Sequence, residues 1–251
     1  MTRQPPAAVL REDQKAFLES LESIVGTEFV ASDLATRYIY SQDLTENEPH
    51  WPFGVVMPSN PEEVQRIVLE ANRFCCPLVP FAYGLNMGGL TIPGQDAVVV
   101  DLKRMKRILE VNEEDLYMLV EPGVTFGMIR AYLDEHHAGF RYTYPLAPPQ
   151  TSALSNALMD GLNNMSMWHG AMSEWLNGLE AVLPTGEMVR VGSCAIVDSW
   201  HGRAPLPDLA GLFLGWQGAT GIVTKGALQI WPAPRVRKRF FLAAYDARTA
   251  C

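Results

Sequence analysis

The segment PFAYGLNMGG constrains the fold most, because a glycine-rich loop comes directly after a run of apolar residues. We call this segment the first loop. Several glycines let backbone N–H groups turn into one concavity, which suits a phosphate or diphosphate. The spacing of Gly84, Gly88 and Gly89 is not GxGxxG, and no helical pattern follows directly, so the sequence predicts neither a Rossmann site nor a P-loop. Taken alone, the first loop is either a phosphate site or a surface turn.

A second glycine-bearing segment, GWQGATGIVTK, lies far from the first and leads into a strand rich in branched residues. We call it the second loop. Two such loops could close on one extended ligand, although each is equally well explained as a structural turn. Between them, Thr151, Ser152, Ser155 and Asn156 surround the start of a helix of small residues. Their hydroxyls and the free amides there either bind an anion or cap that helix.

Hydrophobic periodicity predicts alternating helices and strands over most of the chain. Apolar residues recur at helical spacing in residues 11–25 and in PSNPEEVQRIVLEANRF, and a third helix is expected in TFGMIRAYLDEHH. Apolar runs predict strands in GVVMP, CCPLVPF, AVVVDL and YMLVEPG. Beyond YTYPLAPPQ, the sequence predicts a small-residue helix, a hairpin of NGLEAVLPTG and EMVRVGS, and the strand GIVTKGALQIWP.

These patterns predict an α+β fold built from two α/β units. The first unit is expected to span residues 1–140 and the second residues 141–235. Residues 236–251 contain a new apolar run, RFFLAAYDA, which we interpret as the start of a truncated further domain or as a tail.

Composition and missing motifs exclude several classes of function. A net charge of −8 opposes a nucleic-acid partner, because lysine and arginine supply most of that binding energy. The sequence has no apolar run of about 18 residues and no secretory signal, so we expect no membrane span and a cytoplasmic location. It has no histidine motif for metal binding and no GxSxG, so neither a metal site nor a simple hydrolase is predicted.

Six segments, in this order, resemble the FAD-binding domain of the vanillyl-alcohol oxidase and p-cresol methylhydroxylase (PCMH) family. Each is a weak signal alone, but six in the family's order, over roughly residues 50–232, are specific. They are PSNPEEVQRIVLEAN, the first loop, VVVDLKRMKRILEVNEEDLYMLVEPGVTF, NALMDGLNN, NGLEAVLPTGEMVRVGS and LAGLFLGWQGATGIVTK. The resemblance implies a PCMH-type fold of two subdomains that hold an extended FAD between them.

The resemblance also implies which residues bind FAD. The first loop would wrap the diphosphate. The start of the small-residue helix, at Thr151, Ser152 and Asn156, would line the diphosphate and the ribityl chain of FAD. The turn after YMLVE would lie beside the adenosine, and the second loop would pack against FAD. The implied residues are Ala82, Tyr83, Gly84, Leu85, Asn86, Met87, Gly88, Pro122, Gly123, Thr151, Ser152, Asn156, Gly221, Ile222 and Val223.

The first loop also bears on how FAD is held. Many family members attach the flavin covalently, but the first loop offers Asn86 and Met87 instead of a histidine, so we expect a dissociable FAD. Valine at Gly84 or Gly88 is expected to weaken FAD binding, because a branched side chain would occupy space that the phosphates need.

The implied chemistry is a two-electron oxidation, in which a substrate C–H bond gives hydride to FAD while a base takes a hydroxyl or phenol proton. Family members oxidise alkylphenols, aryl alcohols, 2-hydroxy acids or sugars, and a cap domain supplies much of their substrate site. The chain stops where that cap would start, so we expect a cap that is absent, truncated or carried by a partner chain. The electron acceptor is not predicted.

The catalytic candidates are Asn163, Asn164 and His169, which follow the segment that approaches the flavin ring in relatives. His169 follows a tryptophan in a loop-like stretch, and it is either a general base or a structural histidine. The expected partners are an alcohol or hydroxy acid substrate and a partner subunit or second copy. The alternative function is a non-catalytic FAD-binding or assembly subunit of a larger complex.

Overall fold

The computed structural model describes most of the chain. The described residues are 10–86, 88–94, 96–143, 146–203, 207–236, 238, 240, 243 and 246. Met87 and most of the apolar run RFFLAAYDA therefore lie outside the described residues. Within the described ranges, no helix combines the length and apolar character needed to cross a membrane.

The first part of the chain forms a four-stranded sheet with the strand order β1-β2-β4-β3. Strands β2, β4 and β3 are parallel, and β1 is antiparallel to β2. The strands and the helices that accompany them are β1 (Val30–Ala31), β2 (Gly54–Val56), β3 (Leu78–Phe81), β4 (Val98–Asp101), α1 (Glu12–Val25), α2 (Leu34–Ile39) and α3 (Pro61–Arg73).

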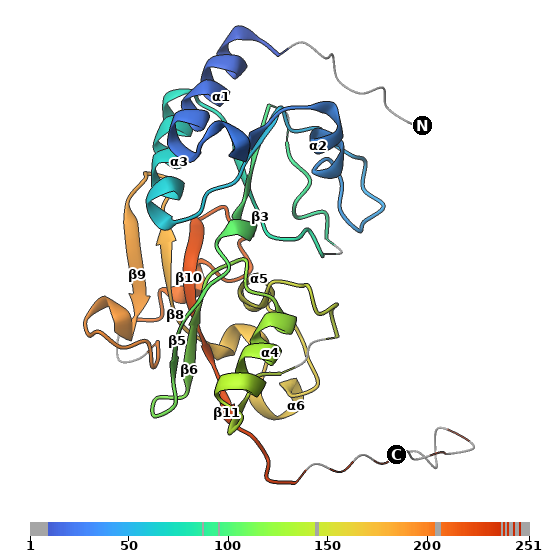
Figure 1. Cartoon of the computed structure of the whole chain (residues 1–251), viewed down its shortest axis with the longest axis vertical. Coiled ribbons are helices and arrows are strands. Elements are labelled where there is room, and N and C mark those ends of the chain that lie inside the picture. The colour runs from blue at the N-terminus through green and yellow to red at the C-terminus, as the bar shows by residue number, and fades with distance from the viewer. Residues whose placement is uncertain are drawn as a thin grey trace.

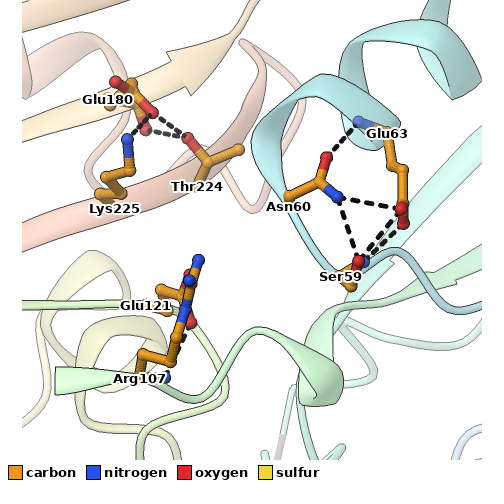
Figure 2. Close-up of polar contacts among 8 residues, drawn as sticks. All are labelled: Ser59, Asn60, Glu63, Arg107, Glu121, Glu180, Thr224 and Lys225. Atoms are coloured by element: carbon orange, nitrogen blue, oxygen red, sulfur yellow. Dashed lines mark hydrogen bonds and ion pairs between the residues drawn. The ribbon is translucent and has the colours of Figure 1, made fainter. Parts of the chain in front are cut away.

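The helix α3 begins at residue 61 because the preceding residues satisfy its free N–H groups. The side chain of Asn60 accepts a hydrogen bond from the backbone of Glu63 at 2.8 Å, and the Glu63 carboxylate in turn accepts one from the backbone N–H of Ser59 at 2.7 Å (Figure 2). Pro61 occupies the first helical position, where no N–H is needed. The apolar stripe of α3 then packs with α1 against β2 and β4.

The second part forms a five-stranded antiparallel sheet with the order β5-β6-β10-β8-β9. One face of this sheet is covered by α4, α5 and a short 3₁₀ turn at Met172–Trp175, which together make the largest core. The elements are β5 (Ile108–Asn112), β6 (Tyr117–Val120), α4 (Phe126–His136), α5 (Ala153–Leu158), α6 (Ser166–His169), β8 (Leu176–Val182), β9 (Met188–Gly192) and β10 (Ile222–Gln229), with the small pair β7 (Phe140–Arg141) and β11 (Trp231–Pro232).

The two sheets share one interface. Val182 and Ile222 belong to the second sheet, yet both are buried in the core of the first. The helix α3 also reaches the β8–β9 hairpin, because the side chain of Gln65 donates to the carbonyl of Gly186 at 2.7 Å. Figure 1 shows the resulting arrangement, with the first sheet and its helices stacked on one end of the second.

The structure contains the helices and strands that periodicity predicts, up to β10. It also contains α2, β1 and β5, which the sequence analysis does not predict. The chain passes from the first sheet to the second between Asp101 and Ile108, so β5 and β6 hydrogen-bond within the second sheet. The division of the chain into domains at residue 140 stays a prediction.

The Asn60→Ala variant tests the cap of α3. We expect it to lower the free energy of unfolding by about 1 kcal/mol, because one N–H group of the helix loses its acceptor. Urea unfolding measures the change. The matched control is Glu19→Ala, at an exposed position of α1, which should change stability by less than about 0.5 kcal/mol. Equal stability of wild type and Asn60→Ala would contradict the cap.

Glu180 on β8 is a buried carboxylate with several partners. The Lys225 ammonium lies 2.8 Å from its carboxylate, and the hydroxyl of Thr224 donates to it at 3.1 Å (Figure 2). The Arg190 guanidinium lies 3.2 Å from it. Burial works to raise the pKa of Glu180, but the hydrogen bond and charge of Lys225, followed by Arg190, outweigh it and lower that pKa. A carboxyl with a lowered folded pKa stabilises the fold above its unfolded pKa and loses this contribution as pH falls through the folded pKa.

We therefore expect Glu180→Gln to be less stable than wild type at about pH 7, and the gap to shrink below the ordinary carboxyl pKa of about 4.3. Urea unfolding between neutral pH and about pH 3.5 measures both curves. A gap that stays constant over this range would show that Glu180 does not act through its charge.

Candidate functional site

A cavity of about 340 Å³ lies where segments from distant parts of the chain meet. Its walls come from the end of β3 and the first loop, from the turn at Pro122, from α5 and from the second loop. This volume falls in the usual range of small-molecule sites, and the cavity lies where loops of the two sheets converge.

The first loop has a backbone shape that favours glycine. Tyr83 and Gly84 both have positive φ angles, +66° and +62°. A Cβ on Gly84 would lie 2.8 Å from the ring of Phe81, so no larger residue fits there without movement. The side-chain oxygen of Asn86 accepts hydrogen bonds from the backbone N–H groups of Gly88 at 3.0 Å and Leu90 at 3.1 Å. Asn86 therefore fixes the turn of the loop.

The turn at Pro122 is fixed by an ion pair behind it. Glu121 is fully buried and binds the backbone N–H of Arg107 at 2.7 Å and its guanidinium at 2.7 and 3.1 Å (Figure 2). Gly123 passes so close to its neighbours that a Cβ there would lie 2.6 Å from the carbonyl oxygen of Met105. This packing places Pro122 at the cavity wall.

The start of α5 contributes polar atoms to the cavity. The hydroxyl of Ser152 accepts from the N–H of Ser155 at 3.0 Å and donates to the carbonyl of Pro122 at 2.5 Å, so it both caps the helix and ties it to the turn. Thr151 and Asn156 also line the cavity, and their side-chain oxygens are buried without a hydrogen-bond partner among the described residues. Buried polar atoms without partners are rare, so these two oxygens indicate a polar ligand.

The second loop touches the first. Gly218 has a φ of +85°, and a Cβ on it would lie 2.8 Å from the ring of Pro80, where the first loop begins. Gly221 lies equally close to β8, with only 2.7 Å between its Cβ position and the carbonyl oxygen of Val182. Both glycines are thus required by close packing, and that packing brings the two loops to one cavity.

The described lining of the cavity carries no charged side chain. It consists of apolar groups, backbone, hydroxyls and the amides of Asn86, Asn156 and Gln217. An anionic ligand would therefore be held by N–H and O–H donors, as in other backbone anion sites. No group of three His, Cys, Asp or Glu side chains gathers anywhere in the described ranges.

Most of the FAD-binding residues expected from sequence gather at this cavity, and their contact with FAD stays a prediction. Those that line it are Ala82, Gly84, Leu85, Asn86, Pro122, Thr151, Ser152, Asn156, Gly221 and Val223. Four others are not part of the described lining, namely Tyr83, Gly88, Gly123 and Ile222. Among these, the hydroxyl of Tyr83 donates to the carbonyl of Gly123 at 3.0 Å. Met87 lies outside the described residues.

Sequence reasoning missed two lining residues that the structure makes prominent, Thr91 and Gln217. Thr91 accepts a hydrogen bond from the amide of Asn86 at 3.2 Å, and Gln217 has a positive φ of +57° beside Gly218. The GWQG pattern is the sequence signal that could have found Gln217, because the glycines on either side of the WQ pair favour a turn there.

The three catalytic candidates lie near one another but are not part of the described cavity lining. The hydroxyl of Thr143 donates to the side-chain oxygens of Asn163 at 2.7 Å and Asn164 at 3.0 Å. The side-chain amide nitrogen of Asn163 is buried and has no partner in the described structure. The ring of His169 packs 4.7 Å from that of Trp231. Their catalytic role stays a prediction.

Comparison with known proteins identifies the family. A family model described as "FAD binding domain" matches residues 52–192. The chain belongs to this family of FAD-binding domains. Among curated relatives, the glycolate oxidase subunit GlcD of Bacillus subtilis is 33% identical over 91% of the chain and 47% of its own length. The flavoprotein subunit of 4-cresol dehydrogenase from Pseudomonas putida is 29% identical over 94% of the chain and 46% of its own length.

Solved structures confirm that this FAD-binding domain has the PCMH-type fold. The 4-ethylphenol oxidase of Gulosibacter chungangensis superposes with a TM-score of 0.81 and 30% identity, over 93% of this chain and 45% of that one. The p-cresol methylhydroxylase gives a TM-score of 0.77 and 25% identity, over 92% and 46%. The chain thus spans about half the length of the relatives it matches. The uncharged cavity with its two unpartnered oxygens fits the FAD that the family binds.

The Gly84→Val variant tests whether the first loop contacts FAD. We expect it to raise the Kd of FAD at least about tenfold, because a branched residue at positive φ strains the loop and meets Phe81. Titration of the apoprotein with FAD, followed by flavin fluorescence, measures Kd.

Gly139→Val is the matched control for this experiment. Gly139 is exposed, has no positive φ, has nothing within 4 Å of its Cβ position and lies outside the described lining. We expect its Kd to stay within about twofold of wild type. The loss of affinity expected for Gly88→Val stays a prediction, and a Cβ there would lie 3.0 Å from the side chain of Leu90, which lines the cavity. Equal Kd values for Gly84→Val and wild type would count against the first loop as the FAD site.

Proposed function

We propose that the chain is the flavin-binding half of an oxidoreductase that transfers a hydride from an organic hydroxyl or alkylphenol substrate to FAD. The observation that carries this proposal is the cavity between the two glycine loops, where Thr151 and Asn156 present unpartnered oxygens. FAD held there would supply the hydride acceptor for a substrate C–H bond, which protein side chains alone cannot provide. The first loop, the Pro122 turn and the second loop would hold its diphosphate and adenosine.

The proposed substrates fall into two classes, and relatives support each. The names of GlcD and of an Arabidopsis thaliana D-lactate dehydrogenase refer to glycolate and lactate, which are 2-hydroxy acids. The 4-cresol dehydrogenase and the 4-ethylphenol oxidase are named for alkylphenols. A 2-hydroxy acid or an aryl alcohol loses its hydroxyl proton along with the hydride and becomes a carbonyl compound. An alkylphenol also loses a hydride, from its alkyl carbon, but the proton comes from its phenolic hydroxyl.

Either reaction needs a base for that proton, and the described cavity lining contains no titratable side chain. The base must therefore lie beyond this lining. We propose His169, with Asn163 and Asn164, as the candidate group near the substrate, since Asn163 still has a free buried donor. Some curated relatives are named as subunits, which supports the further proposal that a partner chain completes the site.

The lack of a titratable side chain in the described cavity lining also supports the second candidate function. A non-catalytic FAD-binding or assembly subunit would need the cavity but no proton acceptor beside it. The two candidates differ in whether bound FAD can be reduced by a substrate.

The visible spectrum of the FAD-loaded protein separates these candidates. We expect the purified chain to be yellow, to release its flavin on denaturation, and to bleach anaerobically when glycolate, D-lactate or 4-ethylphenol is added. The Gly84→Val variant, loaded poorly with FAD, is the negative control for flavin-dependent bleaching.

Two outcomes would contradict the proposal at different points. Bound FAD that none of these substrates bleaches, but that dithionite reduces, would favour the non-catalytic subunit. Failure of the wild-type chain to bind FAD would remove the cavity as a flavin site altogether.

A further inference from the structure

A cluster of charge and aromatic rings lies directly behind the first loop. Its centre is Asp101, the last residue of β4, whose side chain is fully buried. The Asp101 carboxylate accepts hydrogen bonds from the backbone N–H of Lys103 at 3.0 Å and from the hydroxyl of Tyr40, and it pairs with the Lys103 ammonium at 3.0 Å. A buried carboxylate requires such partners, so these residues hold each other in place.

The Lys103 ammonium also faces three aromatic rings. It lies 5.4 Å from the ring centroid of Tyr40, 5.6 Å from that of Phe81 and 6.0 Å from that of Tyr83. These distances are within the range of cation–π attraction. Burial, followed by the negative charge of Asp101, raises the pKa of Tyr40, so its hydroxyl stays protonated as a donor to the carboxylate.

Two of these rings belong to the segment that shapes the cavity. Phe81 lines the cavity, and its ring lies 2.8 Å from the position of a Cβ on Gly84. Tyr83 has a positive φ, which residues other than glycine seldom adopt. The hydroxyl of Tyr83 reaches Gly123, and a Cβ on Gly123 would in turn lie only 2.8 Å from the carbonyl oxygen of Lys103. The Lys103 ammonium and backbone thus contact both the first loop and the Pro122 turn.

We propose that Lys103 is a positioning residue that holds the first loop in the shape that binds FAD. Lys103 is not part of the described cavity lining, so it acts through Phe81 and Tyr83. This inference rests on the proposed FAD site, and it names the charged residue on which an otherwise uncharged site depends.

The Lys103→Met variant tests this role, because methionine keeps most of the aliphatic stem and loses the charge. We expect the Kd of FAD to rise about tenfold, as the rings lose their cation and the loop relaxes. In the apoprotein, the backbone amides of residues 82–86 should exchange hydrogen faster than in wild type. Lys103→Arg, which keeps the cation over the rings, should restore both readouts to within about threefold of wild type.

Lys225→Met is the matched control. Lys225 also pairs with a buried carboxylate that keeps other partners, that of Glu180, but it lies in the second sheet and outside the described cavity lining. Both variants should lose thermal stability, while only Lys103→Met should lose FAD affinity and loop protection. Should Lys103→Met not fold, Lys103→Gln carries the same test, since it keeps a donor for Asp101 and lacks the charge.

Three results would overturn the inference. Lys103→Met could match Lys225→Met in FAD affinity and exchange, which would reduce Lys103 to a structural residue. Wild-type FAD binding could weaken steeply with salt and lose that dependence in Lys103→Met, which would indicate direct contact with the diphosphate. Unchanged exchange of residues 82–86 in apo Lys103→Met would exclude the positioning role even if the chain bound no FAD. This readout therefore distinguishes failure of the inference from failure of the proposed function.

Discussion

The constraint on which the proposed site depends is that its described lining, which has no charged side chain, would have to bind a diphosphate without a cation. An anion in an uncharged cavity is stabilised only if several N–H and O–H donors converge on it and are held there before it arrives. The described lining offers backbone, hydroxyl and amide groups, and these would have to supply the donors. The glycines of the two loops allow close approach of backbone within the protein, as between Gly218 and Pro80, and would allow the same approach to a ligand.

The rest of the fold keeps these donors in place. The two sheets share a core through Val182 and Ile222, so loops from different sheets face one another across a fixed distance. Charged groups stand behind the cavity, where Glu121 with Arg107 fixes one wall and Asp101 with Lys103 fixes another. This separation keeps the described cavity lining uncharged while ion pairs stabilise the backbone around it.

Sequence patterns predicted the parts of the fold that depend on local periodicity. The apolar stripes of α1 and α3 and the runs in β4 and β8 are long enough to show their period. The elements β1 and α2 are short, and β5 is interrupted by an irregularity between Ile108 and Glu110, so their patterns are weak. The family resemblance supplied most of the cavity residues, yet no local pattern shows that Gly218 meets Pro80 or that Lys103 lies behind Phe81, because these contacts join distant segments.

Hydrogen exchange of the wild-type chain with and without FAD tests whether both loops form one site, since it observes both in one experiment. We expect FAD to slow exchange in residues 82–86 and in residues 217–222 together, with little change in β9. Protection of only one loop, or of neither while FAD is bound, would contradict a single site formed by both.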